Sequence, residues 1–126
     1  MKRVLDGPVK AAGAPYSPAV EANGLVFVSG QVPLHPETRK VVEGGIEAQA
    51  RQALQNLRGT LDAAGCAPAD VLKTTIFLTN MDHYAAVNAV YAEMFPTDPP
   101  ARTAVAVAAL PFGVLIEVEA IAAKPN

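Results

Sequence analysis

The sequence predicts an α+β fold, in which one mixed β-sheet carries two helices on one face. Two observations support this prediction. Short runs of β-branched and apolar residues, typical of strands, alternate along the chain with two segments whose apolar residues recur at helical spacing. The 126 residues contain no internal repeat and no composition shift that would mark a linker, so we expect a single domain over residues 1–126.

The N-terminal part of the chain predicts a loop followed by a β-hairpin. Residues 7–18 are rich in Gly, Pro and Ala, and because prolines restrict the backbone we expect an ordered or partly ordered loop. An Asn-Gly pair at positions 23–24 is a strong signal for a two-residue turn. It joins residues 19–22 to the apolar run 25–32, and residues 33–45 then form a turn-rich connection.

Two helices and a strand follow. The clearest helix spans residues 46–64, and Gly65 lies just past its end, where glycine is favoured. The β-branched segment 71–79 predicts a strand, and a second helix is expected over residues 83–95. Apolar residues form one stripe on each helix: Ile46, Ala50, Ala53, Leu54, Leu57, Leu61 and Ala64 on the first, and Tyr84, Val87, Val90, Tyr91 and Met94 on the second.

Two further strands are predicted over residues 102–109 and 114–122. The four residues between them, 110–113, are few enough for a tight turn, so we expect these strands to form an antiparallel hairpin. The two helices cover only one face of the sheet, whereas the strands carry apolar side chains on both. Because a small domain does not leave such a face in water, we expect the chain to self-associate.

Composition and charge argue against several classes of function. Ten Lys and Arg against twelve Asp and Glu give a net charge of −2, without the clustered cationic surface that nucleic-acid binding requires. No apolar run approaches the ~20 residues that span a bilayer, and no apolar core of a signal peptide follows the basic start of the chain. The single cysteine, Cys66, permits neither an internal disulfide nor a cysteine-based metal cluster. We therefore expect no nucleic-acid partner, no membrane association, no metal site and a cytoplasmic location.

Arg102 stands out by its isolation, because it is the only Lys or Arg between Lys73 and Lys124. It begins a predicted strand whose same face continues with small residues, first Ala104, so space remains beside the guanidinium. The planar fork of an arginine is suited to binding a carboxylate. The alternative is a structural role, either as a solvated strand start or in an ion pair with Asp98, Glu117 or Glu119.

Glu117 and Glu119 alternate with apolar residues in the last predicted strand, so both carboxylates lie on one face, roughly 6–7 Å apart. Neighbouring acids raise each other's pKa and so become suited to acid–base chemistry. The alternative is an ordinary solvated strand face. The expected hairpin would bring both acids within reach of Arg102, which favours the functional interpretation. Tyr16, in a loop flanked by prolines, is a further candidate, although exposed loop tyrosines are common.

Seven segments of the sequence match a known family in order and spacing: 13–20 (GAPYSPAV), 28–33 (VSGQVP), 48–57 (AQARQALQNL), 73–78 (KTTIFL), 87–91 (VNAVY), 100–105 (PARTAV) and 116–122 (IEVEAIA). Together they resemble the RidA (YjgF) family of reactive intermediate deaminases, also described as the endoribonuclease L-PSP family. The resemblance extends from Gly13 to Ala122. Any one segment would be a weak signal, but seven in register are highly specific.

The resemblance implies a chorismate-mutase-like fold and a homotrimer with a central barrel of sheets, in which three identical clefts lie between neighbouring subunits. It also implies an activity that needs no cofactor, the hydrolysis of reactive enamines and imines such as 2-aminoacrylate to 2-oxo acids and ammonia. The implied partner is therefore a small imino or enamino acid, or the 2-oxo acid product.

The family's site residues can be transferred position by position. Its key arginine matches Arg102, its loop tyrosine matches Tyr16, and its water-orienting glutamate matches Glu117. The arginine would fix the substrate carboxylate and thereby aim the imine carbon, while the glutamate orients the attacking water. The remaining expected substrate-binding positions are Ser29, Gly30, Asn88 and Ala104, the last of which stands where many members of the family have a cysteine.

Two other functions compete with imine hydrolysis. The same trimer and cleft would serve a protein that binds small carboxylates without turnover, as a regulator or chaperone. Relatives of this family have also been described as endoribonucleases or translation inhibitors. The acidic net charge, the lack of a paired catalytic histidine and the few aromatic residues argue against that second alternative.

Overall fold

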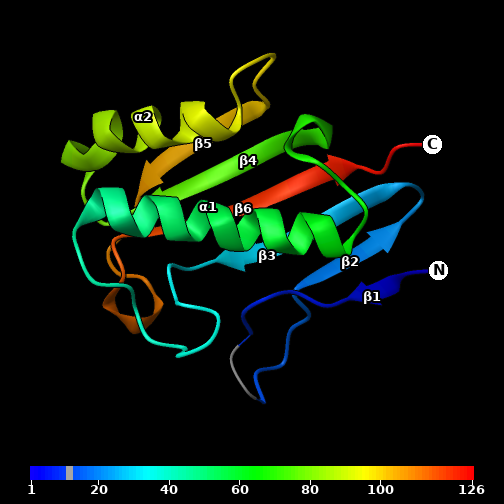
Figure 1. The fold of residues 1–126 in the computed structure, drawn as a ribbon, viewed down its shortest axis with the longest axis horizontal. Helices are drawn as coiled ribbons and strands as arrows, with labels where there is room; N and C mark the ends of the chain where they lie inside the picture. The colour runs from blue at the N-terminus through cyan, green and yellow to red at the C-terminus, as the bar shows by residue number, and fades with distance from the viewer. Residues whose placement is uncertain (11–12) are drawn as a thin grey trace.

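The computed structural model of this chain describes residues 1–10 and 13–126, so part of the expected 7–18 loop, residues 11–12, lies outside the described residues. Six strands form one mixed sheet in the order β1-β2-β3-β6-β4-β5 (Figure 1). All neighbouring strands pair antiparallel except β4 and β5, which are parallel. The strands are β1 (Arg3–Leu5), β2 (Ala19–Ala22), β3 (Leu25–Gln31), β4 (Val71–Leu78), β5 (Ala101–Ala106) and β6 (Ile116–Ala123).

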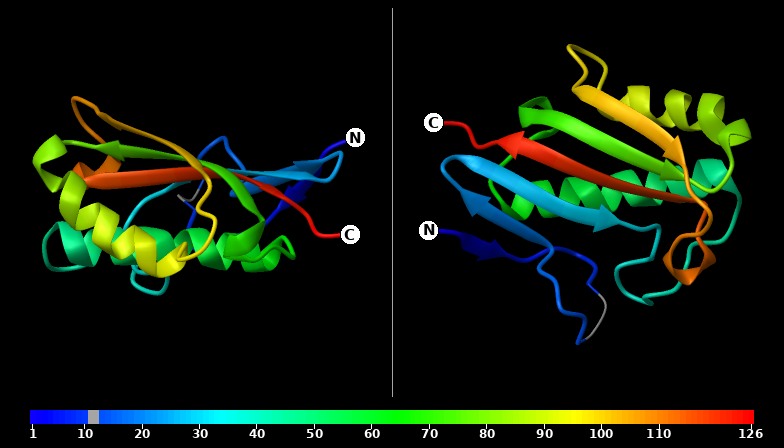
Figure 2. Two further views of the ribbon diagram at one scale, coloured as in Figure 1. Left: turned by 90° about the horizontal axis from the view of Figure 1, so that it is seen from above. Right: turned by 180° about the vertical axis from the view of Figure 1, so that it is seen from behind.

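Two helices, α1 (Ile46–Ala63) and α2 (Tyr84–Met94), lie side by side on one face of this sheet (Figure 2). The predicted α+β fold with both helices on one face is therefore confirmed. The core lies between the helices and this face, where Leu57 and Leu61 of α1 and Ile116 and Val118 of β6 are fully buried. Burying each such side chain contributes about 1.5–3 kcal/mol, so the apolar stripe of α1 is what holds it to the sheet.

The first hairpin forms as predicted. Its turn residues, Asn23 and Gly24, have φ angles of 53° and 78°, the left-handed conformation that a two-residue hairpin turn requires. Strand β1 is not predicted from the sequence, because its three residues are too few to show a periodic pattern. Pairing with β2 stabilises it, since Leu5 lies opposite Ala19 and the Arg3 guanidinium contacts the Glu21 carboxylate at 2.7 Å.

The predicted antiparallel hairpin of the last two strands is wrong. Strand β4 lies between them, pairing in parallel with β5 and antiparallel with β6. The connecting chain passes around the end of β4, where the Val107 amide donates to the Leu78 carbonyl at 2.7 Å and the Thr79 amide donates to the Leu115 carbonyl at 3.2 Å. A short linker permitted a hairpin, but β4–α2–β5 forms a parallel crossover unit and leaves β6 to pair on the other side of β4.

Among the described residues, no helix covers the second face of the sheet (Figure 2). Alternation along the strands places Phe27, Glu117, Glu119 and Val105 on this open face, with their neighbours in sequence on the helix-covered face. Phe27 and Val105 are 41% and 39% exposed, so large apolar side chains face outward. None of the described helices is long and apolar enough to cross a membrane.

Candidate functional site

The candidate site begins at an irregularity in β3. Val28 pairs with Ala120 and Gln31 with Val118, so β3 has one extra residue here, in a β-bulge that contains Ser29 and Gly30. Bulges of this kind redirect side chains and occur often beside active sites. The Ser29 hydroxyl donates a hydrogen bond of 2.6 Å to the carbonyl of Ser17, and the Ser29 amide donates to the Pro18 carbonyl at 2.9 Å. These bonds hold the chain segment that follows Tyr16 against the bulge.

The carboxylate of Glu117 packs directly over Gly30. A Cβ atom at Gly30 would overlap the Oε2 atom of Glu117 and lie 2.8 Å from its Cδ atom. Only glycine therefore permits the approach of the carboxylate to the bulge. This contact brings two of the predicted site residues, Gly30 and Glu117, into one site although they are distant in the sequence.

Two causes raise the pKa of the Glu117 carboxyl above its ordinary value. Burial is the larger, because the carboxylate loses part of its hydration, and the negative charge of nearby Glu119 is the second. A carboxylate with a raised pKa is a stronger base than an exposed one. The arrangement therefore provides one carboxylate suited to accepting a proton from water.

Glu117 lies in an open pocket of about 470 Å³ at one end of the sheet. Tyr16, Ser29, Gly30 and Glu117, four of the predicted site residues, meet in this pocket. The full lining comprises Tyr16, Ser29, Gly30, Val32, Pro111, Phe112, Glu117 and Glu119. Of these, Val32, Pro111 and Phe112 were not anticipated, since nothing in a linear sequence indicates that residues 16, 32 and 112 converge.

Arg102 lies elsewhere, on the edge strand β5. Its Nη2 atom donates a hydrogen bond of 3.0 Å to the Tyr84 hydroxyl, and its Cζ atom lies 5.4 Å from the Tyr84 ring centroid and 4.8 Å from that of Tyr91. Tyr91 is itself fixed by a hydrogen bond of 2.7 Å between its hydroxyl and that of buried Thr74. Two aromatic side chains of α2 thus position the guanidinium through cation–π contacts.

Asn88 and Ala104 belong to this second group. Asn88 lies between Tyr84 and Tyr91 on one face of α2, at the i+4 and i−3 positions. Its Oδ1 atom is buried and has no hydrogen-bond partner among the described residues, which leaves an acceptor for a donor from outside the chain. Ala104 follows Arg102 on the helix-covered face of β5 and packs against the core. Tyr84, 40% exposed, is not the core residue that its place in the stripe predicted.

The predicted site residues therefore form two groups rather than one. Arg102 shares a face with Thr74 and Ala120, whereas Glu117 shares the opposite face with Phe77. The expectation that a hairpin would bring Arg102 close to the two acids is wrong for a single chain. The alternative of an ion pair also fails, because within the described residues no carboxylate lies within ion-pair distance of Arg102.

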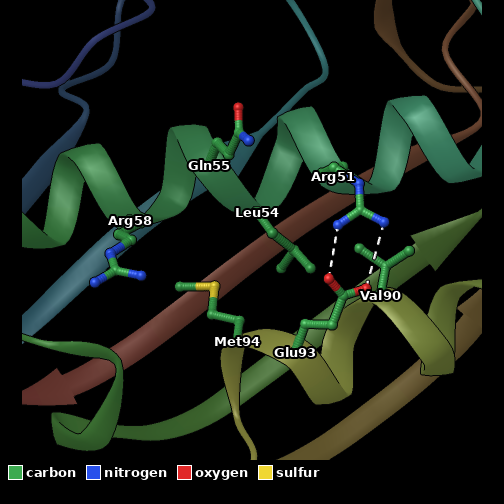
Figure 3. Close-up of a pocket in the computed structure, with 7 residues that line it drawn as sticks. All are labelled: Arg51, Leu54, Gln55, Arg58, Val90, Glu93 and Met94. Carbon is green, nitrogen blue, oxygen red and sulfur yellow. Dashed lines mark hydrogen bonds and ion pairs between the residues drawn. The ribbon is translucent and has the colours of Figure 1, made fainter.

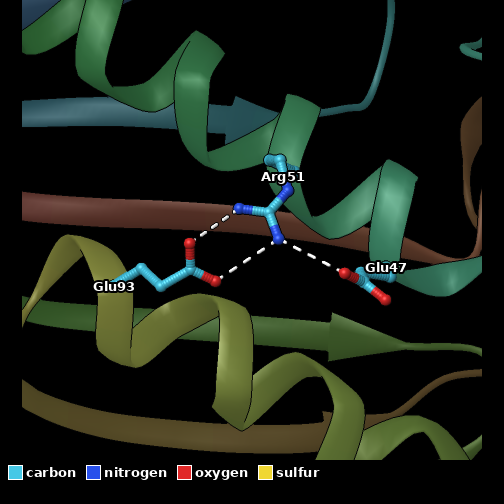
Figure 4. A network of polar contacts seen from close by, with 3 residues as sticks. All are labelled: Glu47, Arg51 and Glu93. Carbon is cyan, nitrogen blue, oxygen red and sulfur yellow. Dashed lines mark hydrogen bonds and ion pairs between the residues drawn. The ribbon is translucent and has the colours of Figure 1, made fainter.

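A second cavity, of about 190 Å³, lies between α1 and α2 and contains none of the predicted site residues (Figure 3). Leu54, Val90 and Met94 contribute apolar side chains to it. At its edge the Arg51 guanidinium contacts Glu93 of α2 at 2.8 Å and Glu47 of its own helix at 3.3 Å (Figure 4). This network ties the two helices together and leaves Arg51 engaged with protein carboxylates.

Cys66 and His35 are not among the residues of either group. Cys66 is buried, and loss of hydration raises the pKa of its thiol, which makes the thiolate less available. His35 accepts hydrogen bonds on Nδ1 from the backbone amides of Glu37 and Thr38, and so stabilises its own turn. Throughout residues 1–10 and 13–126, no three His, Cys, Asp or Glu side chains cluster closely enough to hold a metal ion.

A known protein family matches nearly the whole chain. The match to the family described as Endoribonuclease L-PSP extends over residues 8–124. A mouse protein named 2-iminobutanoate/2-iminopropanoate deaminase is 46% identical over 114 residues, which cover 90% of this chain and 84% of that protein. Protein HMF1 of Saccharomyces cerevisiae is 49% identical over 114 residues, which cover 90% of this chain and 88% of that protein.

The fold comparison agrees with the sequence comparison. The crystal structure of E. coli TdcF with bound serine superposes with a TM-score of 0.91 at 34% identity, covering 98% of this chain and 99% of that one. With a family match over more than nine-tenths of its length, this chain belongs to the endoribonuclease L-PSP family, the family of the RidA (YjgF) proteins that its motifs resemble.

Proposed function

We propose that this protein hydrolyses reactive 2-imino acids, and the enamines that tautomerise to them, to 2-oxo acids and ammonia. The observation that carries the proposal is the Glu117 carboxylate, which is packed over Gly30 in an open pocket and has a raised pKa. The name of the mouse relative, a 2-iminobutanoate/2-iminopropanoate deaminase, supports the same reaction class.

Arg102 binds the substrate carboxylate in this proposal. Its guanidinium is positioned by Tyr84 and Tyr91 and has no carboxylate partner within the described part of the chain. A bidentate bond to the planar carboxylate fixes the adjacent C=N group in one orientation. The small side chain of Ala104 leaves room beside it.

Glu117 accepts the proton of the attacking water. The water oxygen forms a bond to C2 of the protonated imine, the π electrons of the C=N bond move to nitrogen, and Glu117 takes the proton that water loses. Glu117 then returns this proton to the amino nitrogen of the carbinolamine. The C–N bond breaks, the hydroxyl proton leaves as the carbonyl forms, and that proton converts the departing ammonia to ammonium.

The two groups of site residues would meet across an interface between chains. We propose a homotrimer in which Arg102 of one chain faces the Glu117 pocket of a neighbour. Three features support it: β5 is an edge strand, the open face exposes large apolar side chains such as Phe27 and Val105, and Arg102 and Glu117 lie on opposite faces of one chain. The site would thus be incomplete in a monomer.

A mixed-chain experiment tests this arrangement. Arg102→Ala and Glu117→Gln are expected to inactivate separately purified trimers. After the two variants are unfolded together and refolded at equal ratio, about a quarter of the clefts should combine an intact arginine with an intact glutamate, so about a quarter of wild-type activity should return. No recovery, with trimers shown by light scattering, would contradict a shared site. A monomer at micromolar concentration would contradict the trimer itself.

An assay of imine decay separates the competing functions. Imines generated in place from amino acids by an oxidase or dehydratase are followed with and without the protein. Binding of 2-oxo acids without faster imine decay would indicate a binding protein. The family description also makes RNA cleavage an alternative, but the pocket carries Glu117 and Glu119, which repel phosphate. Cleavage of RNA that Glu117→Gln abolishes would favour that alternative instead.

A further inference from the structure

Phe112 is an exposed aromatic residue with a left-handed backbone, and it lines the pocket that contains Glu117. It lies in the short turn Pro111–Gly113, and its side chain is 60% exposed. Its backbone is in the left-handed region, with φ 61° and ψ 12°, and Gly113 follows at φ 69°. A bulky side chain is rare in this conformation, because its Cβ atom crowds the following carbonyl. Such outliers persist where the surroundings hold them and concentrate at ligand sites.

The turn that holds Phe112 is well defined. The Gly113 amide donates to the Leu110 carbonyl at 3.2 Å, and the Val114 amide donates to the Pro111 carbonyl at 3.3 Å. Val114 beside it is buried, which anchors the turn to the core. Phe112 is therefore presented at the pocket by a fixed turn, and it lines the pocket that contains Glu117.

On a single chain, before a neighbour covers it, the open pocket has more space than the smallest substrate fills. Its volume is about 470 Å³. A three-carbon imino acid has about six non-hydrogen atoms and, at about 30 Å³ for each water-sized group, would fill on the order of 180 Å³. Pockets of about 300–1,000 Å³ usually hold ligands of drug size. The lining includes the apolar residues Val32, Pro111 and Phe112 and the aromatic residue Tyr16.

From this geometry we propose that Phe112 forms the binding surface for the substrate's side chain, and that the protein prefers 2-imino acids with bulky apolar side chains to the three-carbon compound. The inference rests on the proposed function. With the carboxylate held by Arg102 and C2 placed at Glu117, the side chain is the part of the substrate left to contact these apolar walls. Acidic side chains are excluded, because Glu117 and Glu119 both lie in the same pocket.

Binding of the stable 2-oxo acid products tests the proposal without requiring turnover. Pyruvate, 4-methyl-2-oxopentanoate, phenylpyruvate and 2-oxoglutarate are titrated into the trimer by calorimetry. We expect the two bulky apolar acids to bind at least about tenfold more tightly than pyruvate, since one apolar group in a fitted pocket changes binding by about 10-fold or more. 2-Oxoglutarate should bind most weakly. Equal affinity for pyruvate and phenylpyruvate would overturn the proposal.

Two variants assign the preference to Phe112. In Phe112→Ala, affinity for phenylpyruvate should fall by about tenfold while affinity for pyruvate stays within about twofold. Phe112→Asn should behave alike, and asparagine tolerates the left-handed backbone, so a loss of preference there cannot be assigned to a misfolded turn. Leu72→Ala is the control, because Leu72 is an exposed apolar residue at the opposite end of β4, outside the pocket lining.

Turnover separates this inference from the proposed function. kcat/KM is measured on imines generated from alanine, leucine and phenylalanine. If Phe112→Ala lowers all three equally, the specificity inference fails while imine hydrolysis stands. If none of the imines is hydrolysed but the affinities for 2-oxo acids depend on Phe112 as expected, the proposed activity is wrong. The role of Phe112 in binding the ligand's side chain is then retained.

Discussion

Arg102 and Glu117 lie on opposite faces of one sheet, with strand β4 between their strands. Arg102 is in register with Thr74 on the helix-covered side, while Glu117 is in register with Phe77 on the open side. In the proposed trimer, a substrate that contacts both groups therefore bridges two copies of the chain. Substitutions at Arg102, at Glu117 and at the residues that position them should therefore have different effects.

Replacing Arg102 should abolish imine hydrolysis and leave the trimer folded. Loss of a charge-assisted contact that the proposed trimer would bury costs about 2–5 kcal/mol of binding, a factor of roughly 30 to several thousand. Arg102→Lys should restore little, because a point charge does not reproduce the bidentate fork. The measurements are calorimetric titration of a 2-oxo acid and light scattering. Full activity in Arg102→Ala, or a crystal soak in which the acid binds away from this guanidinium, would contradict the assignment.

Tyr84 should act as a positioning residue for Arg102. Tyr84→Phe removes the hydrogen bond of 3.0 Å but keeps the ring beneath the guanidinium. A hydrogen bond to a charged group contributes about 1.5–3 kcal/mol, less where solvent reaches it, so we expect KM to rise by about threefold or more with kcat little changed. Tyr84→Leu, which also loses the cation–π contact, should raise KM further. Equal KM values for the wild type and both variants would exclude this role.

Glu117→Gln should slow hydrolysis with little effect on binding of the 2-oxo acid, because its proposed role is to accept a proton. In the wild type, kcat should rise with pH through a pKa above the ordinary carboxyl value, since burial and Glu119 both raise it and the bound substrate carboxylate neutralises the neighbouring Arg102. Glu119→Gln removes the second cause and should move this limb of the pH profile to lower pH. If Glu119→Gln lowers kcat more than Glu117→Gln does, the proton-accepting carboxylate has been assigned to the wrong residue of the pair.

The raised pKa of Glu117 also predicts a stability change. In the window between its ordinary and its raised pKa, the folded state binds more protons than the unfolded state. Stability from this group is therefore present at low pH and is lost as pH rises through the window. Glu117→Gln keeps the shape without the charge, so in an Arg102→Ala background, which removes the neighbouring guanidinium of the proposed trimer, it should raise the melting temperature at pH 7 and remove this pH dependence. A lower melting temperature at pH 7 would contradict the desolvation of Glu117.

Gly30→Ala should inactivate the site without unfolding the protein. The added methyl group would overlap the Glu117 carboxylate, which must then swing away from the bulge. We expect at least a tenfold loss of kcat, since displacements of about 1 Å at a reacting group cost on the order of 100-fold. Gly45→Ala is the matched control, because no atom lies within 4 Å of a Cβ atom placed there. Wild-type kinetics in Gly30→Ala would show that the carboxylate need not lie over residue 30.

Local patterns in the sequence were enough to predict most elements. Helix α1 was expected over residues 46–64 and spans Ile46–Ala63, because its apolar stripe follows from residue spacing alone. The hairpin at Asn23 and Gly24 likewise depends on two adjacent residues that accept left-handed angles. The motifs that resemble the RidA family identified Tyr16, Glu117 and Arg102 as candidates, and the family itself is confirmed.

Tertiary structure decided which strands pair and therefore which side chains meet. Strand pairing is a long-range choice, and a linker such as 110–113 permits either a hairpin or a passage around β4. That choice put Arg102 and Glu117 on opposite faces, brought Glu117 over the bulge at Gly30, and carried Phe112 into the same pocket as Tyr16. The raised pKa of Glu117 depends on these neighbours, because desolvation is a property of the packed chain and not of a residue's place in the sequence.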